Sequence, residues 1–239
     1  MKVSFLLPTK TSDRNYEEFA AKVIESINEN CSHEKEILVF GPNEIKGENI
    51  KWFEEEDWCP SGCIYGYNYL FEQSSGEFVF VANDEYMFQN RAPDMAIEIL
   101  ESSYYKDKKF KILGMASPIR SFPNEHMTNG YTCVPNFDLV ERNFRICGYP
   151  AFHRQTIEEC LDGFIFHPRI KHHYGDNFLP FYAGFMGEPI NDCPASDFKL
   201  VRDKDLTYYE YDNHDFEIYS GLVSDLVSGK TTRYVEERP

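Results

Sequence analysis

The sequence predicts an α/β fold in which a central, largely parallel sheet is flanked by helices. Three observations support this prediction. Short, predominantly apolar runs such as 3–7 and 78–82 are typical of strands that are buried on both faces. Segments with apolar residues at helical spacing alternate with these runs, as expected when helices connect parallel strands. The chain also has 239 residues, of which 42% are apolar and 16% aromatic, enough to fill one sizeable core.

The first half of the chain reads as strands and helices in alternation. Each predicted strand is a short apolar run that ends at a turn-forming or polar residue, as Pro8 ends the first. Each predicted helix has apolar residues at helical spacing, and Glu17 and Glu18 stand near the start of the first helix, where the dipole favours them. In chain order, we expect a strand at 3–7, a helix around 19–27, strands at 36–40 and 50–53, a helix around 64–71 and a strand at 78–82.

The middle of the chain is less regular. Pro93 suits the first turn of a helix that continues to Leu100, and a further strand is predicted at 111–115. Residues 118–145 show no clean periodicity and contain three prolines, so we expect long loops and edge strands there.

Two helices in the last third are marked by residue type. The run Thr156-Ile157-Glu158-Glu159 fits a capping box, in which the Thr and Glu side chains bond to backbone N–H groups at a helix start. Gly163 is a suitable stop for that helix. An amphipathic pattern over 216–226 predicts a last helix, closed by Gly229. Because no internal repeat or low-complexity linker interrupts the chain, we expect one domain over 1–239.

The composition excludes several classes of protein. The formal net charge is −16, from 24 Lys and Arg against 40 Asp and Glu. This acid excess argues against a nucleic-acid binder, because phosphate neutralisation needs Lys and Arg. There is no run of roughly eighteen apolar residues, so no transmembrane segment is expected, and the apolar N-terminal run is too short for a signal peptide. The seven cysteines are irregularly spaced and read as reduced thiols. These features predict a cytoplasmic protein.

Polar residues follow the predicted strand 78–82 directly. Asn83, Asp84 and Glu85 would lie beyond the carboxyl end of this strand, where open α/β sheets bind their ligands. Acids there are costly unless they are paired, solvated or bound to a metal ion. Successive residues of an extended chain point to opposite faces, so one acid could hold a cation while its neighbour contacts another group. The alternative is an Asn-Asp turn that only ends the strand.

Two further segments carry candidate residues. Asp176 stands where a loop is expected to enter a helix, either as the helix N-cap or as a general base. His214 precedes the last helix and is either a metal ligand or an ordinary loop residue. His167, His172 and His173 could also bind a metal ion, but the His-Glu-x-x-His spacing of metal hydrolases is absent.

The order of these features resembles the GT-A glycosyltransferases, in particular the large inverting family 2 of nucleotide-sugar-dependent enzymes. Residues 3–9 match that family's first strand with its Pro-Thr turn, and 36–40 match its second strand. Gly62 with Tyr67-Asn68 matches the segment before the metal strand, and 76–85 match the strand that leads to the Asp-x-Asp motif. The run from Gly148 through Gly163 to Gly175-Asp176 matches the acceptor-side block that carries the catalytic base.

The resemblance implies a single GT-A domain over 1–239, with a nucleotide-sugar-binding half at about 1–115 and an acceptor-side half at about 116–239. The nucleotide contacts that it implies are Pro8, Thr9, Asn68, Asn83 and Asp84. The ligands that it implies for Mn²⁺ or Mg²⁺ are Glu85, Asp84 and His214. An alternative alignment makes Asn83 and Glu85 the two ends of the metal motif. The residue that corresponds to the catalytic base is Asp176.

The predicted function is therefore metal-assisted transfer of a sugar from a nucleotide sugar, with a UDP-sugar favoured, to the hydroxyl of a carbohydrate or other acceptor, with inversion. The enzyme class would be a hexosyl- or N-acetylhexosaminyltransferase. Three features depart from the family pattern: Gly41-Pro42 replaces an acid, Tyr67 replaces an arginine, and 83–85 is not a strict Asp-x-Asp. They leave open a non-catalytic sugar-nucleotide-binding protein of the same fold. A metal-dependent hydrolase built on the histidines is the third alternative.

Overall fold

The computed structural model describes residues 1–9, 16–54, 58–84, 86–115, 149–171, 174–188, 190–193, 198–200 and 212–235. The predicted loops at 118–145 lie outside these residues, as do Glu85, His172 and His173. The elements, in chain order, are β1 (Lys2–Pro8), α1 (Tyr16–Asn30), β2 (Glu34–Gly41), β3 (Ile50–Glu54), α2 (Trp58–Gln73), β4 (Phe78–Val81), β5 (Tyr86–Phe88), α3 (Ala92–Leu100), β6 (Ile112–Met115), β7 (Pro150–His153), α4 (Arg154–Cys160), α5 (Gly175–Phe185), β8 (Asn191–Cys193), β9 (Phe198–Leu200) and α6 (Asp212–Val227).

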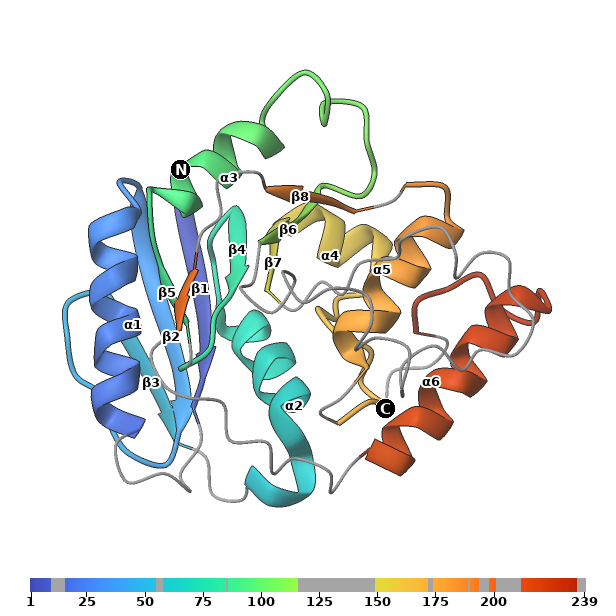
Figure 1. Cartoon of the computed structure of the whole chain (residues 1–239), viewed down its shortest axis with the longest axis horizontal. Helices are drawn as coiled ribbons and strands as arrows, with labels where there is room; N and C mark the ends of the chain where they lie inside the picture. Colours follow the sequence, from blue (N-terminus) through green and yellow to red (C-terminus); the bar gives the residue numbers. More distant parts are fainter. Residues whose placement is uncertain are drawn as a thin grey trace.

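The strands form a mixed sheet with the order β3-β2-β1-β4-β7-β6-β8 (Figure 1). The first four strands are parallel. β7 runs antiparallel to both of its neighbours, β4 and β6, and β8 is parallel to β6. β5 and β9 form a separate antiparallel pair. The predicted α/β fold, with a mostly parallel sheet flanked by helices, is confirmed.

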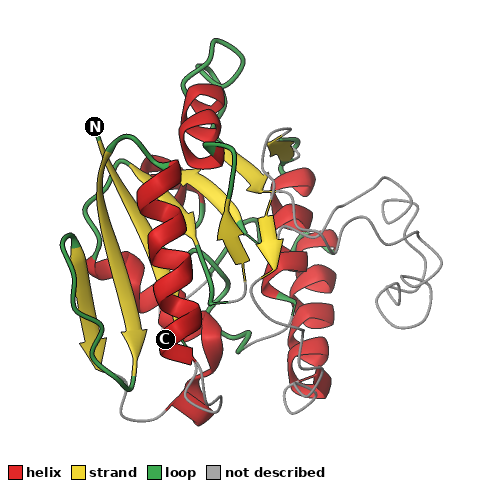
Figure 2. Cartoon of the chain, turned by 60° about the vertical axis from the view of Figure 1, so that its left-hand side comes forward, coloured by secondary structure: helices red, strands yellow, loops and turns green. Residues whose placement is uncertain are grey.

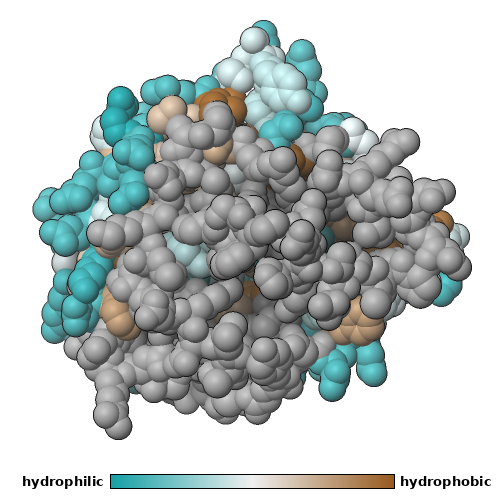
Figure 3. Space-filling model, in the orientation of Figure 1, coloured by the Kyte–Doolittle hydropathy of each residue, from teal (hydrophilic) through white to brown (hydrophobic). Residues whose placement is uncertain are grey.

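Helices cover both faces of the sheet (Figure 2). Val3, Phe5 and Leu7 of β1 point into a core that is closed by α1 and α3, whereas Leu6 points into a core that is closed by α2, α4, α5 and α6. Both sets are fully buried, which explains why β1 is apolar without alternation. Figure 1 shows α1 and α2 on opposite sides of β1. The described surface along α1 is mostly hydrophilic, as expected for the outer face of a covering helix (Figure 3).

The start of α4 corrects one prediction. The helix begins at Arg154, and its N-cap is His153, whose ring accepts a hydrogen bond from Gln155 N at 3.3 Å. Thr156 is therefore inside the helix and is not the cap of a capping box. Its hydroxyl instead accepts a bond from Lys111 N at 2.9 Å and donates to Lys109 O at 3.1 Å, which ties α4 to the chain that enters β6.

The described glycines at the predicted helix ends have the conformation that such ends need. Gly163 has φ 87° and Gly229 has φ 73°, values in the left-handed region that favours glycine. Within the described ranges, no helix combines the length and the apolar character needed to cross a membrane.

Candidate functional site

The carboxyl ends of β1, β2 and β4 meet at one edge of the sheet. Thr9 N donates to Phe40 O at 2.9 Å, and Ala82 N donates to Leu6 O at 2.9 Å, so the three strands end side by side. Thr9 is 1% exposed. A Cβ at position 41 would collide with the Thr9 hydroxyl, so Gly41 is needed for this close approach. The departure from the family's acid at this position thus has a packing reason.

Asn83 and Asp84 extend β4 beyond this edge, as predicted. The Asn83 amide donates to the Tyr149 hydroxyl at 2.9 Å, and Asp84 is a buried carboxylate, 6% exposed. The Tyr67 hydroxyl donates to Ala82 O at 3.0 Å. Tyr67, which stands where the family has an arginine, therefore braces the end of the strand that carries Asp84. Sequence reasoning treated Tyr67 only as a missing arginine and did not predict this contact.

Asp176 lies in the first turn of α5, but it is not the N-cap. The N-cap is Tyr174, which has φ 66° and ψ −2° and forms no side-chain cap bond. The N-cap interpretation of Asp176 is therefore wrong. A tyrosine in the left-handed region is strained and needs support from its surroundings. That support comes from α6, where Tyr219 stacks on the Tyr174 ring at 5.4 Å and Phe216 lies against it at 5.8 Å.

Two contacts from α2 set the position of the α5 start. Ile64 N donates to Lys171 O at 3.1 Å, which holds the chain just before α5. A Cβ at position 175 would lie 2.7 Å from Ile64 Cδ1 and 3.3 Å from Phe166 Cδ1, so Gly175 lets α5 begin directly against α2. Asp176 is the next residue and is only partly buried.

Asn68 fastens the segment 164–171, which leads to α5. Its side-chain oxygen accepts bonds from Ile165 N at 3.0 Å and Phe166 N at 3.2 Å, and its amide donates to Phe166 O at 2.9 Å. These bonds give Asn68 a structural role that the sequence reasoning missed. Its predicted contact with the nucleotide stays a prediction.

Asp215 is a fully buried carboxylate at the start of α6 that sequence reasoning also missed. Its Oδ1 accepts a bond from Lys171 N at 3.0 Å and lies 2.9 Å from His214 Nδ1. The backbone N–H of Lys171 is thus bonded to α6, and its backbone C=O is bonded to α2. The His214 side chain is 49% exposed, and its ring is oriented by Asp215. An imidazole oriented by a carboxylate is the usual arrangement of a metal-binding histidine.

Cys63 and Tyr219 share the surroundings of these two acids. Burial raises the pKa of the Cys63 thiol, and the nearby Asp176 and Asp215 carboxylates raise it further. Burial likewise raises the pKa of Tyr219 to about 12, with smaller contributions from Tyr174 and Asp176. Both groups are therefore protonated at neutral pH.

His167 is a core residue. It is 2% exposed, and its ring packs edge-on against Phe178 at 5.4 Å and Tyr234 at 5.8 Å. Burial lowers its pKa to about 4. Within the part of the chain that is described, no three His, Cys, Asp or Glu side chains gather closely enough to hold a metal ion. His167 thus gives no support to the hydrolase alternative.

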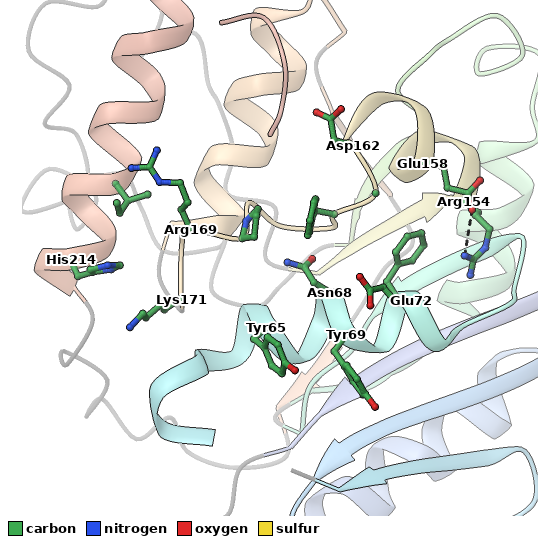
Figure 4. A pocket seen from close by; sticks show the side chains of 15 residues that line it. Tyr65, Asn68, Tyr69, Glu72, Arg154, Glu158, Asp162, Arg169, Lys171 and His214 are labelled. Atoms are coloured by element: carbon green, nitrogen blue, oxygen red, sulfur yellow. Dashed lines mark ion pairs between the residues drawn. The ribbon is translucent and has the colours of Figure 1, made fainter. Parts of the chain in front are cut away.

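A groove of about 980 Å³ lies beside these contacts (Figure 4). α2 contributes Tyr65, Tyr69 and Glu72 to its lining, and the opposite wall comes from α4, the 162–171 segment and the start of α6. Three of its charged residues are already paired: Arg154 lies 3.6 Å from Glu158, and Asp162 lies 2.6 Å from Arg233, which is outside the lining. Lys171 and His214, the neighbours of Asp215, form one end.

The contact between Gly175 and Ile64 can be tested by adding a methyl group. Gly175→Ala should be less stabilising than an unhindered Gly-to-Ala change in a helix, because the new Cβ must displace Ile64 Cδ1 and press on Phe166, which offsets the roughly 0.5–1 kcal/mol gained from alanine in a helix. Gly221→Ala in α6 is the matched control, since a Cβ there meets nothing within 4 Å, and it should stabilise the protein by about 0.5–1 kcal/mol. Urea unfolding measures both changes. Equal effects of the two substitutions would contradict the close packing of α5 on α2.

Comparisons with known proteins identify the fold. No protein-family model matches the chain, and no curated protein matches it by sequence. Solved structures do match. S. aureus TarS 1–349 in complex with UDP-GlcNAc superposes with a TM-score of 0.65 at 15% identity, covering 95% of this chain and 66% of that chain. The mannosyltransferase PcManGT from Pyrobaculum calidifontis, in complex with GDP-Man and Mn²⁺, gives a TM-score of 0.57 at 13% identity, covering 95% and 63%.

A third match is glucosyl-3-phosphoglycerate synthase from Mycobacterium tuberculosis in complex with Mg²⁺ and UDP, with a TM-score of 0.52 at 12% identity, covering 99% of this chain and 80% of that chain. The chain thus has the fold of the GT-A glycosyltransferases, and the predicted fold class and resemblance are confirmed. It spans about two thirds of the length of the TarS and PcManGT structures.

Proposed function

We propose that this protein is a glycosyltransferase that moves a sugar from a nucleotide sugar to an acceptor hydroxyl. The observation that carries the proposal is the placement of two acids on the GT-A fold, with Asp84 buried at the end of β4 and Asp176 in the first turn of α5. Ligands bind beyond the carboxyl ends of the strands in open α/β sheets. The neighbouring structures hold UDP, UDP-GlcNAc or GDP-Man.

The donor would lie at the strand ends, against Pro8, Thr9, Asn83 and Asp84. A UDP-sugar is the favoured donor, since the TarS structure and the synthase structure both hold UDP. The transferred group would be a hexose or an N-acetylhexosamine. Thr9 is fixed by its backbone bond to Phe40 and Asn83 by its bond to Tyr149, so the pocket residues are held in place before the donor arrives.

Mn²⁺ or Mg²⁺ fits the donor groups that the chain offers at this edge. Both ions favour oxygen ligands, which the Asp84 carboxylate supplies; Glu85, outside the described residues, is its predicted partner. His214 is oriented by Asp215 in the way that suits a metal ligand. When bound, the ion would offset the charge that develops on the departing diphosphate.

Asp176 would act on the acceptor. As the acceptor hydroxyl attacks the sugar, it must lose a proton, and a carboxylate within hydrogen-bond reach can take it. Asp176 is suited to this task because Tyr174, Gly175 and the 164–171 segment fix the start of its helix. For inversion, this carboxylate and the departing diphosphate would lie on opposite faces of the sugar.

The proposal is tested by thermal unfolding with a panel of UDP- and GDP-sugars, each with Mn²⁺ and with a chelator. The correct donor at saturating concentration should raise the melting temperature by roughly 5–10 °C, and the chelator should remove most of the shift. No shift with any nucleotide sugar would contradict the proposal. Release of the nucleoside diphosphate distinguishes the enzyme from a non-catalytic binding protein, because the latter gives the shift without the release.

A further inference from the structure

The groove along α2 lies outside most of the proposed donor site. Pro8, Thr9, Asn83 and Asp84 do not line it, whereas Asn68 and His214 do. Its volume of about 980 Å³ is at the upper end of the range for small-molecule sites, so it can take a ligand larger than a single sugar.

One end of the groove adjoins the proposed base. Ile64 packs against the position of Gly175, and the next residue, Tyr65, is part of the groove lining. Lys171 also lines the groove, and its backbone is bonded to Ile64 and to Asp215. Asp176 itself does not line the groove, so a molecule bound there would have to extend beyond the Lys171 and His214 end to bring a hydroxyl to Asp176.

The charges of the groove do not favour an ionic ligand. Glu72 on α2 and Arg169 on the opposite wall have opposite signs (Figure 4). No described residue forms an ion pair with either side chain. The groove lining as a whole carries three acids (Glu72, Glu158 and Asp162) and three bases (Arg154, Arg169 and Lys171), so it has no net charge that would select an anion or a cation, while Glu72 and Arg169 can each bond to neutral hydroxyl groups.

The groove also presents an exposed aromatic surface. Tyr65 is 49% exposed, although it is a large ring. The ring is held in place because Tyr69 stacks on it at 6.1 Å and the buried Phe40 lies behind it at 6.0 Å. A fixed aromatic face next to hydrogen-bonding groups suits the apolar C–H face of a sugar ring and the hydroxyls around its edge.

We infer that this groove binds the acceptor as a neutral carbohydrate chain of more than one sugar, with Tyr65 as the stacking surface and with Glu72 and Arg169 bonding to hydroxyl groups. The inference rests on the proposed function, because it names the acceptor class for the same transfer.

The test measures binding of neutral oligosaccharides to the full chain by calorimetry. The probes are gluco-, manno-, xylo- and N-acetylglucosamine oligomers of one to six units, together with an anionic uronic-acid series. At least one neutral series should bind more tightly as its length increases. Tyr65→Ala should weaken that binding roughly three- to tenfold, the loss expected for one ring contact, whereas Tyr65→Phe should stay within about twofold.

Tyr104→Ala is the matched control, because Tyr104 is also an exposed tyrosine, 58% exposed, but lies outside the groove. It should bind the oligosaccharides like the parent. The inference is overturned if no neutral series binds, if only the anionic series binds, or if Tyr65→Ala binds like the parent. The melting-temperature shift with nucleotide sugars is measured separately. A lack of oligosaccharide binding can therefore be distinguished from a lack of nucleotide-sugar binding.

Discussion

Replacement of Asp176 by Asn should lower sugar transfer by about 10²–10⁴-fold, the usual contribution of a general base. The amide has nearly the shape of the carboxylate but cannot take the proton of the acceptor hydroxyl. The fold should survive, because Asp176 is not the cap of α5. Loss of its negative charge from the first turn should cost about 0.3–1 kcal/mol. Nucleotide-sugar binding should also persist, since the base faces the acceptor.

The measurement compares initial rates of transfer, or of donor hydrolysis by water, for the parent and the variant at saturating donor. Asp94→Asn is the matched control, because Asp94 is also an acid in the first turn of a helix, α3. That variant loses the bond to Arg91 but should transfer sugar at close to the parent rate. If Asp176→Asn stays within a few-fold of the parent, Asp176 is not the base and the inverting mechanism loses its main support.

The sequence was most informative for the strands at the centre of the sheet. β1 and β4 are buried on both faces, so their sequences are apolar without interruption by charge. β7 was missed because it has four residues and pairs with β4 across about seventy positions of sequence, a contact that no local pattern reveals. β5, β8 and β9 have three residues each, too few for a period to be read.

The places of the candidate residues in the fold could be predicted in part for the same reason, while their roles stay predictions. Asp84 follows a buried strand and Asp176 lies at the start of a helix. Strand ends and helix starts can be recognised from the local sequence, so the positions of these two residues could be predicted. Asp215 and Asn68 were missed as positioning residues because their partners are backbone groups of distant segments. A signal was present, however. Asp215 falls on the buried stripe of α6 with Leu222 and Leu226, and a polar residue on an apolar stripe usually has an internal partner.

Glu36 is a charged residue whose loss should clearly destabilise the fold. It is a buried acid, 2% exposed, near the amino ends of the strands, whereas the candidate site lies at their carboxyl ends. Its carboxylate lies 2.9 Å from Lys2 Nζ and 2.6 Å from Lys51 Nζ. Its carboxylate also accepts bonds from the Ser4 hydroxyl at 2.7 Å and from Ser75 N at 2.6 Å. It thus joins β1, β2, β3 and the turn before β4.

The same contacts make this stabilisation depend on pH. Burial alone would raise the pKa of Glu36, but the bonds from Lys2 and Lys51, with those from Ser75 and Ser4, outweigh it and hold the pKa well below its ordinary value. Because the pKa is lower in the folded protein than in the unfolded chain, the stabilisation is complete above the ordinary glutamate pKa and is lost as the pH falls toward the folded value.

Glu36→Ala should therefore lower the free energy of unfolding at pH 7 by about 1–3 kcal/mol, because the Ser4 hydroxyl and Ser75 N lose their acceptor while the partly exposed Lys2 and Lys51 can turn to solvent. Glu34→Ala is the matched control, because Glu34 is an exposed acid on the same strand, and it should change stability by less than about 0.5 kcal/mol. Urea unfolding at pH 7 and at successively lower pH tests both statements. The difference between the parent and Glu36→Ala should shrink as the pH falls below the ordinary glutamate range, since the parent then loses its stabilising charge. A difference that is small at pH 7, or that grows on acidification, would mean that Glu36 does not hold these strands together through its charge.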